Sequence, residues 1–218
     1  MIKPALVIFD MDGLMLDTEP LAIQGWKSAA KELNITIPED IYHQVIGKTR
    51  ELCKSIMLER IQSFDFEAAL TIVHKYVDLY FETHGVPLKP GLLHILDCLE
   101  EKGVKKSVAT STATDRAIHK LTLANISHRF DAIIGGDQVP HSKPAPDIFL
   151  KSASSCRTAP KDCIVLEDSN PGAQGGYSAG MQVIVIPDLV PPADATRSKA
   201  LAICKDLYQA WDFINQLL

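Results

Sequence analysis

Two patterns of hydrophobic and polar residues divide the chain near residue 87. From Pro90 onward, short apolar runs alternate with segments in which apolar residues recur every three or four positions. The first kind of run is typical of buried strands and the second of amphipathic helices. The expected strands are 104–109, 132–134, 163–166 and 182–186, and the expected helices are 92–102, 115–124, 147–154 and 173–179. Such an alternation indicates a parallel sheet with helices on both faces.

The first part of the chain contains one apolar run and otherwise only helical periodicity. Residues 5–9 are all apolar and are followed directly by acidic residues, which predicts a buried parallel strand whose carboxyl end opens onto a site. Helical spacing then extends to about residue 86, with breaks at Pro38, at Gly47 and around Ser63. The expected helices are 19–34, 41–46, 51–61 and 67–83. Four helices with short loops make a small bundle.

The order of these elements predicts an insertion. One strand comes first, an all-helical stretch follows, and the rest of the α/β pattern comes last. We therefore predict a doubly wound α/β core domain of residues 1–16 and 87–218, with a four-helix cap domain of residues 17–86 inserted just after the first strand.

Composition narrows the possible partners and the compartment. With 218 residues, 46% of them hydrophobic, the chain can form one good core and a smaller module. A net charge of −5 without any run of Lys and Arg argues against nucleic acid or an anionic membrane as partner, so a small molecule is expected. The first apolar run is too short for a signal peptide, and no stretch has membrane length, so we expect a cytoplasmic protein. A monomer is expected, although the sequence leaves the oligomeric state open. Five scattered cysteines offer neither a disulfide framework nor a CxxC metal site.

Polar side chains gather at the carboxyl ends of three expected strands. Ligands of doubly wound sheets bind at that edge, so these groups are candidates for one site. Acids pressed together repel unless a cation lies among them, and an oxygen-only set without a His or Cys cluster suits Mg²⁺ rather than zinc. The candidates are Asp10 and Asp12, Thr110 and Ser111, and Glu167 and Asp168.

The segment Asp10-Met11-Asp12-Gly13 has other possible interpretations. An ordinary turn stays open on these four residues alone, since Gly13 permits backbone angles that a side chain forbids. An EF-hand calcium loop is excluded, because Leu14 and Leu21 occupy the fifth and twelfth positions, where oxygen ligands would be required.

Asp10-Met11-Asp12-Gly13 after an apolar strand resembles the first motif of the haloacid dehalogenase-like hydrolases, and the family's remaining motifs follow in order. Among them, Lys143-Pro144-Ala145-Pro146-Asp147 resembles the third motif. The resemblance covers nearly the whole chain and implies a Rossmann-like core of strand order 3-2-1-4-5 with a type 1 cap. It also allows a short edge strand at 200–204, where the pattern alone predicts a helix over 200–218.

The resemblance implies a role for each motif residue. Mg²⁺ is expected to bind to the carboxylate of Asp10, the backbone carbonyl of Asp12, and Asp168. Glu167 would either bind the metal directly or contact the groups that do. Attack by Asp10 on phosphorus would give an acyl phosphate, and Asp12 would protonate the leaving oxygen and later deprotonate water. The remaining charge on the phosphoryl group would be met by Thr110, the backbone N–H of Ser111, and Lys143.

Two further polar residues are weighed differently. The segment Gly47-Lys48-Thr49-Arg50 is similar to a loop that faces the active site in relatives that handle sugar phosphates, so Arg50 is a candidate substrate ligand; a solvated Arg at a helix start is the alternative. His141 has no motif to support it and is interpreted as a polar loop residue. Trp26 is expected in the core of the helical bundle.

The function expected from this resemblance is a Mg²⁺-dependent phosphatase acting on a small phosphorylated metabolite, such as a sugar or nucleoside monophosphate. The chain looks most like the branch that contains pseudouridine 5'-phosphatase and β-phosphoglucomutase. A phosphomutase is the alternative, but mutase relatives carry a His where this chain has Ala22. A dehalogenase would lack the second acid that Asp12 supplies, and a binding-only module would lack at least one catalytic residue.

Overall fold

The computed structural model describes residues 3–46, 48, 50–61 and 63–218 and divides the chain into two compact units. One consists of Met1–Leu16 and Leu88–Leu218, and the other of Asp17–Pro87. The chain therefore leaves the first unit after its first strand and returns to it once, so that the second unit is an insertion in the first.

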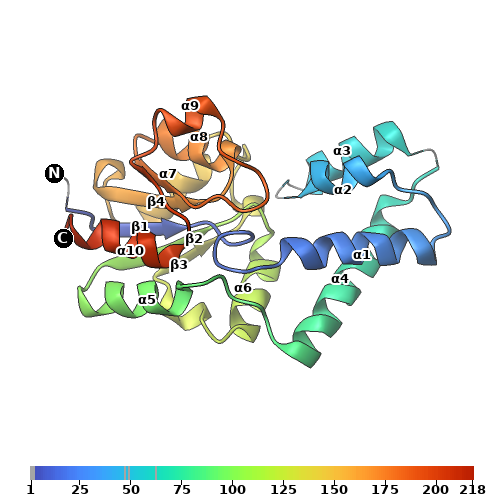
Figure 1. Ribbon diagram of the computed structural model, residues 1–218, viewed down its shortest axis with the longest axis horizontal. Coiled ribbons are helices and arrows are strands. Elements are labelled where there is room, and N and C mark those ends of the chain that lie inside the picture. The colour runs from blue at the N-terminus through green and yellow to red at the C-terminus, as the bar shows by residue number, and fades with distance from the viewer. Residues whose placement is uncertain (1–2, 47, 49, 62) are drawn as a thin grey trace. The chain divides into compact units, whose positions relative to one another are not determined.

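The first unit is built on a six-stranded parallel sheet of order β3-β2-β1-β4-β5-β6 (Figure 1). Its central strand, β1, pairs with β2 on one side and β4 on the other, and all four of its residues are fully buried. A strand that is covered on both faces needs apolar residues throughout, which is why it has no alternation. The strands are β1 Leu6–Phe9, β2 Lys105–Ala109, β3 Ala132–Ile134, β4 Cys163–Glu167, β5 Gln182–Val185 and β6 Ala202–Ile203. The predicted order 3-2-1-4-5 is confirmed.

Helices cover both faces of this sheet. Figure 1 shows α7 and α8 above the strands and α5 and α6 below them, while α10 packs against α5. The helices are α5 Leu92–Glu101, α6 Thr114–Leu123, α7 Asp147–Ser155, α8 Asn170–Ser178, α9 Asp194–Arg197 and α10 Leu207–Asn215. Three short 3₁₀ turns, Ser127–Arg129, Gly136–Gln138 and Pro160–Asp162, lie between them.

Besides shifts of one or two residues at the ends of elements, three differences from the expected helices and strands matter. Helix α8 begins at Asn170 rather than at residue 173, because the Ser169 hydroxyl accepts a hydrogen bond from the Gly172 N–H (3.1 Å) and Pro171 fits a first turn. Residues 200–218 are not one helix: the two-residue strand β6 comes first and α10 follows. The short helix α9 was not predicted, since four residues carry no readable periodicity.

A tight turn follows β1. The N–H groups of Met15 and Leu16 both donate to the carbonyl of Met11 (2.9 and 3.0 Å), and the Gly13 N–H donates to the carbonyl of Leu16 (2.9 Å). Gly13 has φ +88°, a conformation that a side chain disfavours. The turn expected at Gly13 is thus present, and both Asp10 and Asp12 are held on a short, well-connected piece of backbone.

The second unit contains four helices with their own apolar core. Helices α1 and α4 form its most extensive pair, and the rings of Trp26 and Phe66 lie 5.9 Å apart within that core. The expectation for Trp26 is confirmed. The helices are α1 Glu19–Glu32, α2 Glu39–Val45, α3 Arg50–Arg60 and α4 Phe66–His84. The predicted break at Gly47 lies outside the described residues. Among the helices that the structure describes, none has both the length and the apolar character that crossing a membrane requires.

Candidate active site

Strand register brings the ends of β1, β2 and β4 to one edge. Phe9 is aligned with Val108 of β2 and with Leu166 of β4, so the next residue along each strand, Asp10, Ala109 or Glu167, reaches the same level. The Asp10 N–H donates to the carbonyl of Leu166 (3.0 Å), which extends the ladder by one step. Acids that lie about 160 positions apart in sequence are therefore neighbours because the strand order reverses beside β1.

Lys143 joins these three strand ends. Its Nζ lies 2.5 Å from Oδ1 of Asp10, 2.6 Å from Oε1 of Glu167 and 2.9 Å from the carbonyl oxygen of Ala109. The side chain is only 6% exposed, and its Nζ also lies 5.1 Å from the centre of the Phe149 ring. A buried ammonium with three donors finds three acceptors here, so its position is strongly determined.

Burial dominates the electrostatics of Asp10. Removal from water raises the pKa of Asp10 to about 7; Lys143 opposes this rise, while the carboxylates of Glu167 and Asp12 add to it. Burial lowers the pKa of Lys143, but Asp10 and Glu167 more than offset that effect and hold it above its usual range. Lys143 therefore stays charged, and the surrounding acids carry more negative charge than one ammonium can neutralise.

The geometry of these acids fits a hard divalent cation. Asp10, Glu167 and Asp168 can each offer one carboxylate oxygen such that the three atoms lie within 4.8 Å of one another. All three donors are oxygens, and two of the residues are buried. This donor set is the kind that Mg²⁺ prefers, and a cation there would relieve the repulsion that adds to the effect of burial on the pKa of Asp10.

Glu167 is fixed from both sides. Oε1 accepts from Lys143, and Oε2 accepts from the backbone N–H (3.1 Å) and the hydroxyl (2.9 Å) of Ser169. Its carboxylate lies directly against Gly172 in the first turn of α8, where a Cβ would come within 1.8 Å of Oε1. Only glycine leaves room for this side chain, which indicates that the start of α8 is shaped around the Glu167 carboxylate.

Gly172→Ala should therefore impair the site more than the fold. The added methyl group would displace the Glu167 carboxylate from Lys143, and a displacement of that size costs about 100-fold in kcat/KM. Overpacking at one buried position should lower the free energy of unfolding by about 1 to 3 kcal/mol. Steady-state kinetics and thermal unfolding check both effects. Gln174→Ala, an exposed position on the same helix, should change neither, and an active Gly172→Ala protein would show that the position of Glu167 does not matter.

Asp12 lies at the same edge and is held by side chains that follow β2. Its Oδ2 accepts from the Thr112 hydroxyl (2.8 Å), and its Oδ1 accepts from Nζ of Lys120 on α6 (2.7 Å). The Lys120 and Asp12 side chains are 12% and 21% exposed. The carboxyl group of Asp12 thus points to the loop between β2 and α6, away from the Lys143 contacts of Asp10.

The loop after β2 carries the other predicted phosphate ligands. Thr110 is buried, its N–H donates to the carbonyl of Ile134 (3.0 Å), and its hydroxyl accepts from the Thr112 N–H (3.1 Å). A Cβ on Gly136 would lie 2.6 Å from the carbonyl oxygen of Ser111, so the loop after β3 packs tightly against this one. Thr110 and Ser111 are therefore presented by a rigid turn at the sheet edge.

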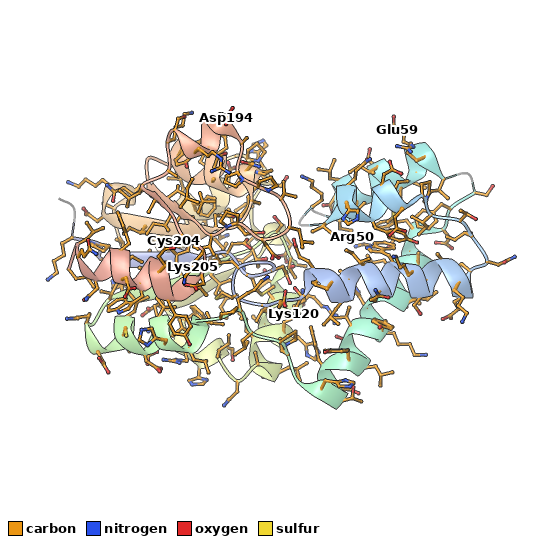
Figure 2. All side chains as sticks on the ribbon, viewed as in Figure 1. Arg50, Glu59, Lys120, Asp194, Cys204 and Lys205 are labelled. Carbon is orange, nitrogen blue, oxygen red and sulfur yellow. The ribbon has the colours of Figure 1, made fainter. Side chains whose placement is uncertain are left out.

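Two further residues considered in the sequence have partners of their own. Arg50 begins α3 in the second unit (Figure 2), where it forms an ion pair with Glu67, which also accepts from Lys54 (3.0 Å). Its neighbours Gly47 and Thr49 in the predicted loop lie outside the described residues. His141 is exposed and lies 3.0 Å from Asp147, in keeping with a polar loop residue.

Sequence reasoning missed four residues that support the site: Thr112, Lys120, Ser169 and Gly172. The signal for Lys120 was weak but present, since it lies beside the buried positions Ala117 and Leu121 on the helix that follows the Thr110 loop. The signal for Ser169 was its place before Asn170 and Pro171, a typical helix start. The others become visible only when the strands are side by side.

Comparison with known proteins places this geometry in a family. A sequence profile described as "Haloacid dehalogenase-like hydrolase" matches residues 7–186. The "Phosphorylated carbohydrates phosphatase" of Thermotoga maritima is 31% identical over 179 residues, which is 82% of each chain. A Drosophila melanogaster protein named "Probable pseudouridine-5'-phosphatase" is 32% identical over 83% of this chain and 80% of its own. The crystal structure of β-phosphoglucomutase from Clostridium difficile superposes with a TM-score of 0.78 at 25% identity and covers 100% of this chain and 97% of that one. The chain therefore belongs to the haloacid dehalogenase-like hydrolases.

Proposed function

We propose that this protein is a Mg²⁺-dependent phosphatase that hydrolyses a small phosphorylated metabolite through an aspartyl-phosphate intermediate on Asp10. Its relatives make it a phosphoric monoester hydrolase, and their names print phosphorylated carbohydrates, hexitols and pseudouridine 5'-phosphate as substrates. The observation that carries the proposal is the contact of the buried Asp10 with Lys143 beside the acids Glu167 and Asp168. The carboxylate of Asp10 can be paired with Lys143 and still attack phosphorus with its other oxygen.

The proposed roles divide between the two aspartates of the first motif. Asp10 attacks phosphorus, which splits hydrolysis into two displacements. Asp12 gives a proton to the leaving oxygen and later takes one from the attacking water. The charge that develops on the phosphoryl oxygens is met by the Thr110 hydroxyl, the Ser111 backbone N–H and the Lys143 ammonium.

The metal would be bound by the Asp10 carboxylate, the Asp12 backbone carbonyl and Asp168, with Glu167 adding to them directly or through its contact with Lys143. When bound, Mg²⁺ supplies positive charge that neutralises the phosphoryl oxygens. The contacts of Glu167 with Lys143 and Ser169 favour a supporting role, because both of its oxygens already accept hydrogen bonds.

The substrate class and the outcome of the second displacement follow from different residues. We propose that the substrate is a sugar or nucleoside monophosphate and that Arg50 in the inserted unit binds it. We also propose that the protein is cytoplasmic and acts as a monomer. A phosphomutase related to β-phosphoglucomutase is the second candidate, since such a structure is among the neighbours. Ala22 on α1 favours hydrolysis, because it cannot exchange protons as the His of mutase relatives can.

A screen of phosphorylated metabolites tests the proposal. The protein is assayed for release of inorganic phosphate from sugar and nucleoside monophosphates, once with Mg²⁺ and once with EDTA. We expect turnover of a subset of sugar phosphates with Mg²⁺ and none with EDTA. Activity that persists in EDTA would refute the metal dependence. Conversion of β-glucose 1-phosphate to glucose 6-phosphate without phosphate release would establish the mutase instead.

Mg²⁺ binding should depend on pH through Asp10. Because the pKa of Asp10 is raised to about 7, the group is largely protonated below that pH and must lose its proton to bind a cation. The apparent affinity should therefore weaken as the pH falls below 7, by up to about tenfold per pH unit. Calorimetric titration of metal-free protein at about pH 6 and about pH 8 measures this, together with proton release on binding. An affinity that is the same at both values would remove Asp10 from the ligand set.

Asp12→Asn should separate the two proton-transfer steps. The variant cannot protonate a leaving alkoxide, so we expect kcat/KM for a sugar phosphate to fall by roughly 100- to 10,000-fold, the usual contribution of general acid catalysis. An activated ester such as p-nitrophenyl phosphate needs no proton on its leaving group, so slow phosphorylation of the enzyme should persist. Rapid-quench kinetics on both esters provides the check. Equal losses would mean that Asp12 is not the acid in the first step.

A further inference from the structure

The carboxyl group of Asp12 is anchored at both oxygens by residues that have no part in the proposed chemistry. Lys120 donates to Oδ1 at 2.7 Å and Thr112 donates to Oδ2 at 2.8 Å. Lys120 lies on α6 (Figure 2), more than a hundred residues along the chain from Asp12. Because Lys120 and Asp12 are so far apart in sequence, their contact is made by the tertiary fold and not by neighbouring residues of one segment.

The backbone alone does not fix this side chain. Asp12 follows β1 on the turn of residues 11–16, and a carboxyl group on a turn is free to adopt several rotamers unless something binds it. A general acid must lie within hydrogen-bond distance of the leaving oxygen. An ionised carboxylate has about four lone-pair positions, so it can accept several hydrogen bonds at once.

The helix that carries Lys120 is itself fixed at its start. Oδ1 of Asp137 accepts from the N–H of Thr114 (2.7 Å) and from its hydroxyl (2.6 Å), and the Gln138 side-chain amide donates to the same hydroxyl (2.8 Å). The Gly136 N–H donates to the carbonyl of Thr112 (3.0 Å). The loop after β3 thus holds both Thr112 and the first turn of α6.

The buried face of α6 sets the direction of Lys120. Ala117 and Leu121 are fully buried, and Lys120 lies between them on the flank of that face with a 12% exposed side chain. Burying a lysine to this degree costs free energy unless the ammonium is paired. The Asp12 carboxylate supplies that partner.

We propose that Lys120 and Thr112 are positioning residues for Asp12, which hold its carboxyl group in the orientation needed to exchange a proton with the leaving group and with water. The inference rests on the proposed function. It assigns a second task to the loop between β2 and α6, which already carries Thr110 and Ser111 for the phosphoryl group, and it gives helix α6 a part in the site through Lys120.

The test compares two esters that differ in their need for a proton. Lys120→Met removes a charge-assisted hydrogen bond, so kcat/KM for the sugar phosphate that ranks first in the screen should fall by about 10- to 100-fold. Thr112→Val removes a neutral one and should cost about 3- to 10-fold. For p-nitrophenyl phosphate, kcat/KM of both variants should stay within about twofold of the parent, since kcat/KM reports the phosphorylation step and this leaving group needs no proton.

Matched controls separate positioning from folding. Lys151→Met makes the same change on α7, where Nζ donates to the carbonyl of Gln138 (2.9 Å) and does not contact Asp12 in any interaction described, and it should leave kcat/KM for both esters unaffected. Lys120→Arg keeps a cation near Asp12 and should recover part of the loss. If Lys120→Met does not fold, Lys120→Arg and Thr112→Val carry the comparison alone, with thermal unfolding as the check on structure.

A double-mutant cycle decides whether Lys120 acts through Asp12. In the Asp12→Asn background, Lys120→Met should change kcat/KM for the sugar phosphate by less than about twofold, because the carboxyl group that Lys120 positions is already absent. A full loss in that background, or equal losses on both esters in the single variants, would overturn the inference. Failure of the unaltered protein to hydrolyse any ester would instead refute the proposed function, so the two failures are distinguishable.

Discussion

Asp10→Asn should abolish turnover and leave the fold intact. The amide keeps the volume of the side chain but cannot attack phosphorus, so kcat should fall by roughly 10⁴- to 10⁶-fold, the range seen when an essential nucleophile is removed. Folding should be preserved or improved, because burial raises the pKa of Asp10 to about 7 and a neutral amide avoids the cost of a buried charge. Steady-state assays and thermal unfolding of the same preparation provide both measurements.

The control for this variant is binding. Asp10→Asn should still bind inorganic phosphate at the loop of Thr110 and Ser111, since neither residue depends on the Asp10 carboxylate. If the variant forms a covalent phosphoenzyme at a normal rate, another residue is the nucleophile. If it fails to fold, the activity loss says nothing of chemistry, and Asp10→Glu, which retains a carboxylate in the wrong place, becomes the test.

Lys143→Met should have the second largest effect, and on stability as well as on rate. The variant leaves Asp10 and Glu167 buried without their shared cation, which should lower the free energy of unfolding by about 3 to 5 kcal/mol in metal-free protein. Turnover should fall by about 1,000-fold, because the phosphoryl oxygens lose a fixed charge. Kinetics and denaturant unfolding measure the two effects.

The stability loss in Lys143→Met should grow with pH. Without the ammonium, the pKa of Asp10 would rise above its present value of about 7, so the buried carboxyl group stays protonated at low pH and costs little. Above pH 7 the carboxyl group of Asp10 is ionised in the unfolded chain, whereas in the folded variant it must either ionise without a partner or remain protonated. Both cost free energy, so the decrease in the free energy of unfolding should be larger at about pH 8 than at about pH 6.

Lys89→Met is the matched control for Lys143→Met. Nζ of Lys89 pairs with Asp188 at 2.6 Å, and both side chains are largely buried. This variant should lose stability without a comparable loss of kcat. If both lysine variants lost activity in proportion to stability, Lys143 would be a structural residue only.

Much of the core domain could be predicted from the sequence, because its strands are marked by short stretches of neighbouring residues. A strand buried on both faces, such as β1, is a continuous apolar run, and the acids that follow it mark the edge where a site can form. Once the order of strands is known, Asp10 and Glu167 must meet, since each directly follows a residue paired in adjacent strands. Thr110 directly follows β2 at the same edge, whereas Lys143 follows no strand and was assigned through its resemblance to the family's third motif.

The supporting contacts were not readable because they depend on packing angles rather than on pattern. Lys120 reaches Asp12 only because the loop after β3 fixes the start of α6, and no spacing in the sequence encodes that distance. Gly172 looks like an ordinary helix residue until the Glu167 carboxylate is seen against it. Strand β6, with two residues, is too short to show any periodicity, which is why the pattern predicted a helix there.

The central claim is that Asp10 becomes covalently phosphorylated, and trapping the intermediate tests it most directly. The unaltered protein is mixed with Mg²⁺ and a sugar phosphate, quenched during turnover and treated with borohydride, which reduces an acyl phosphate to an alcohol. The peptide that contains residue 10 is then examined by mass spectrometry. We predict homoserine in place of Asp10, only when substrate is present, and an unchanged Asp12. A modified Asp12, or an unmodified peptide during steady turnover at a rate that rapid quenching can resolve, would contradict the mechanism.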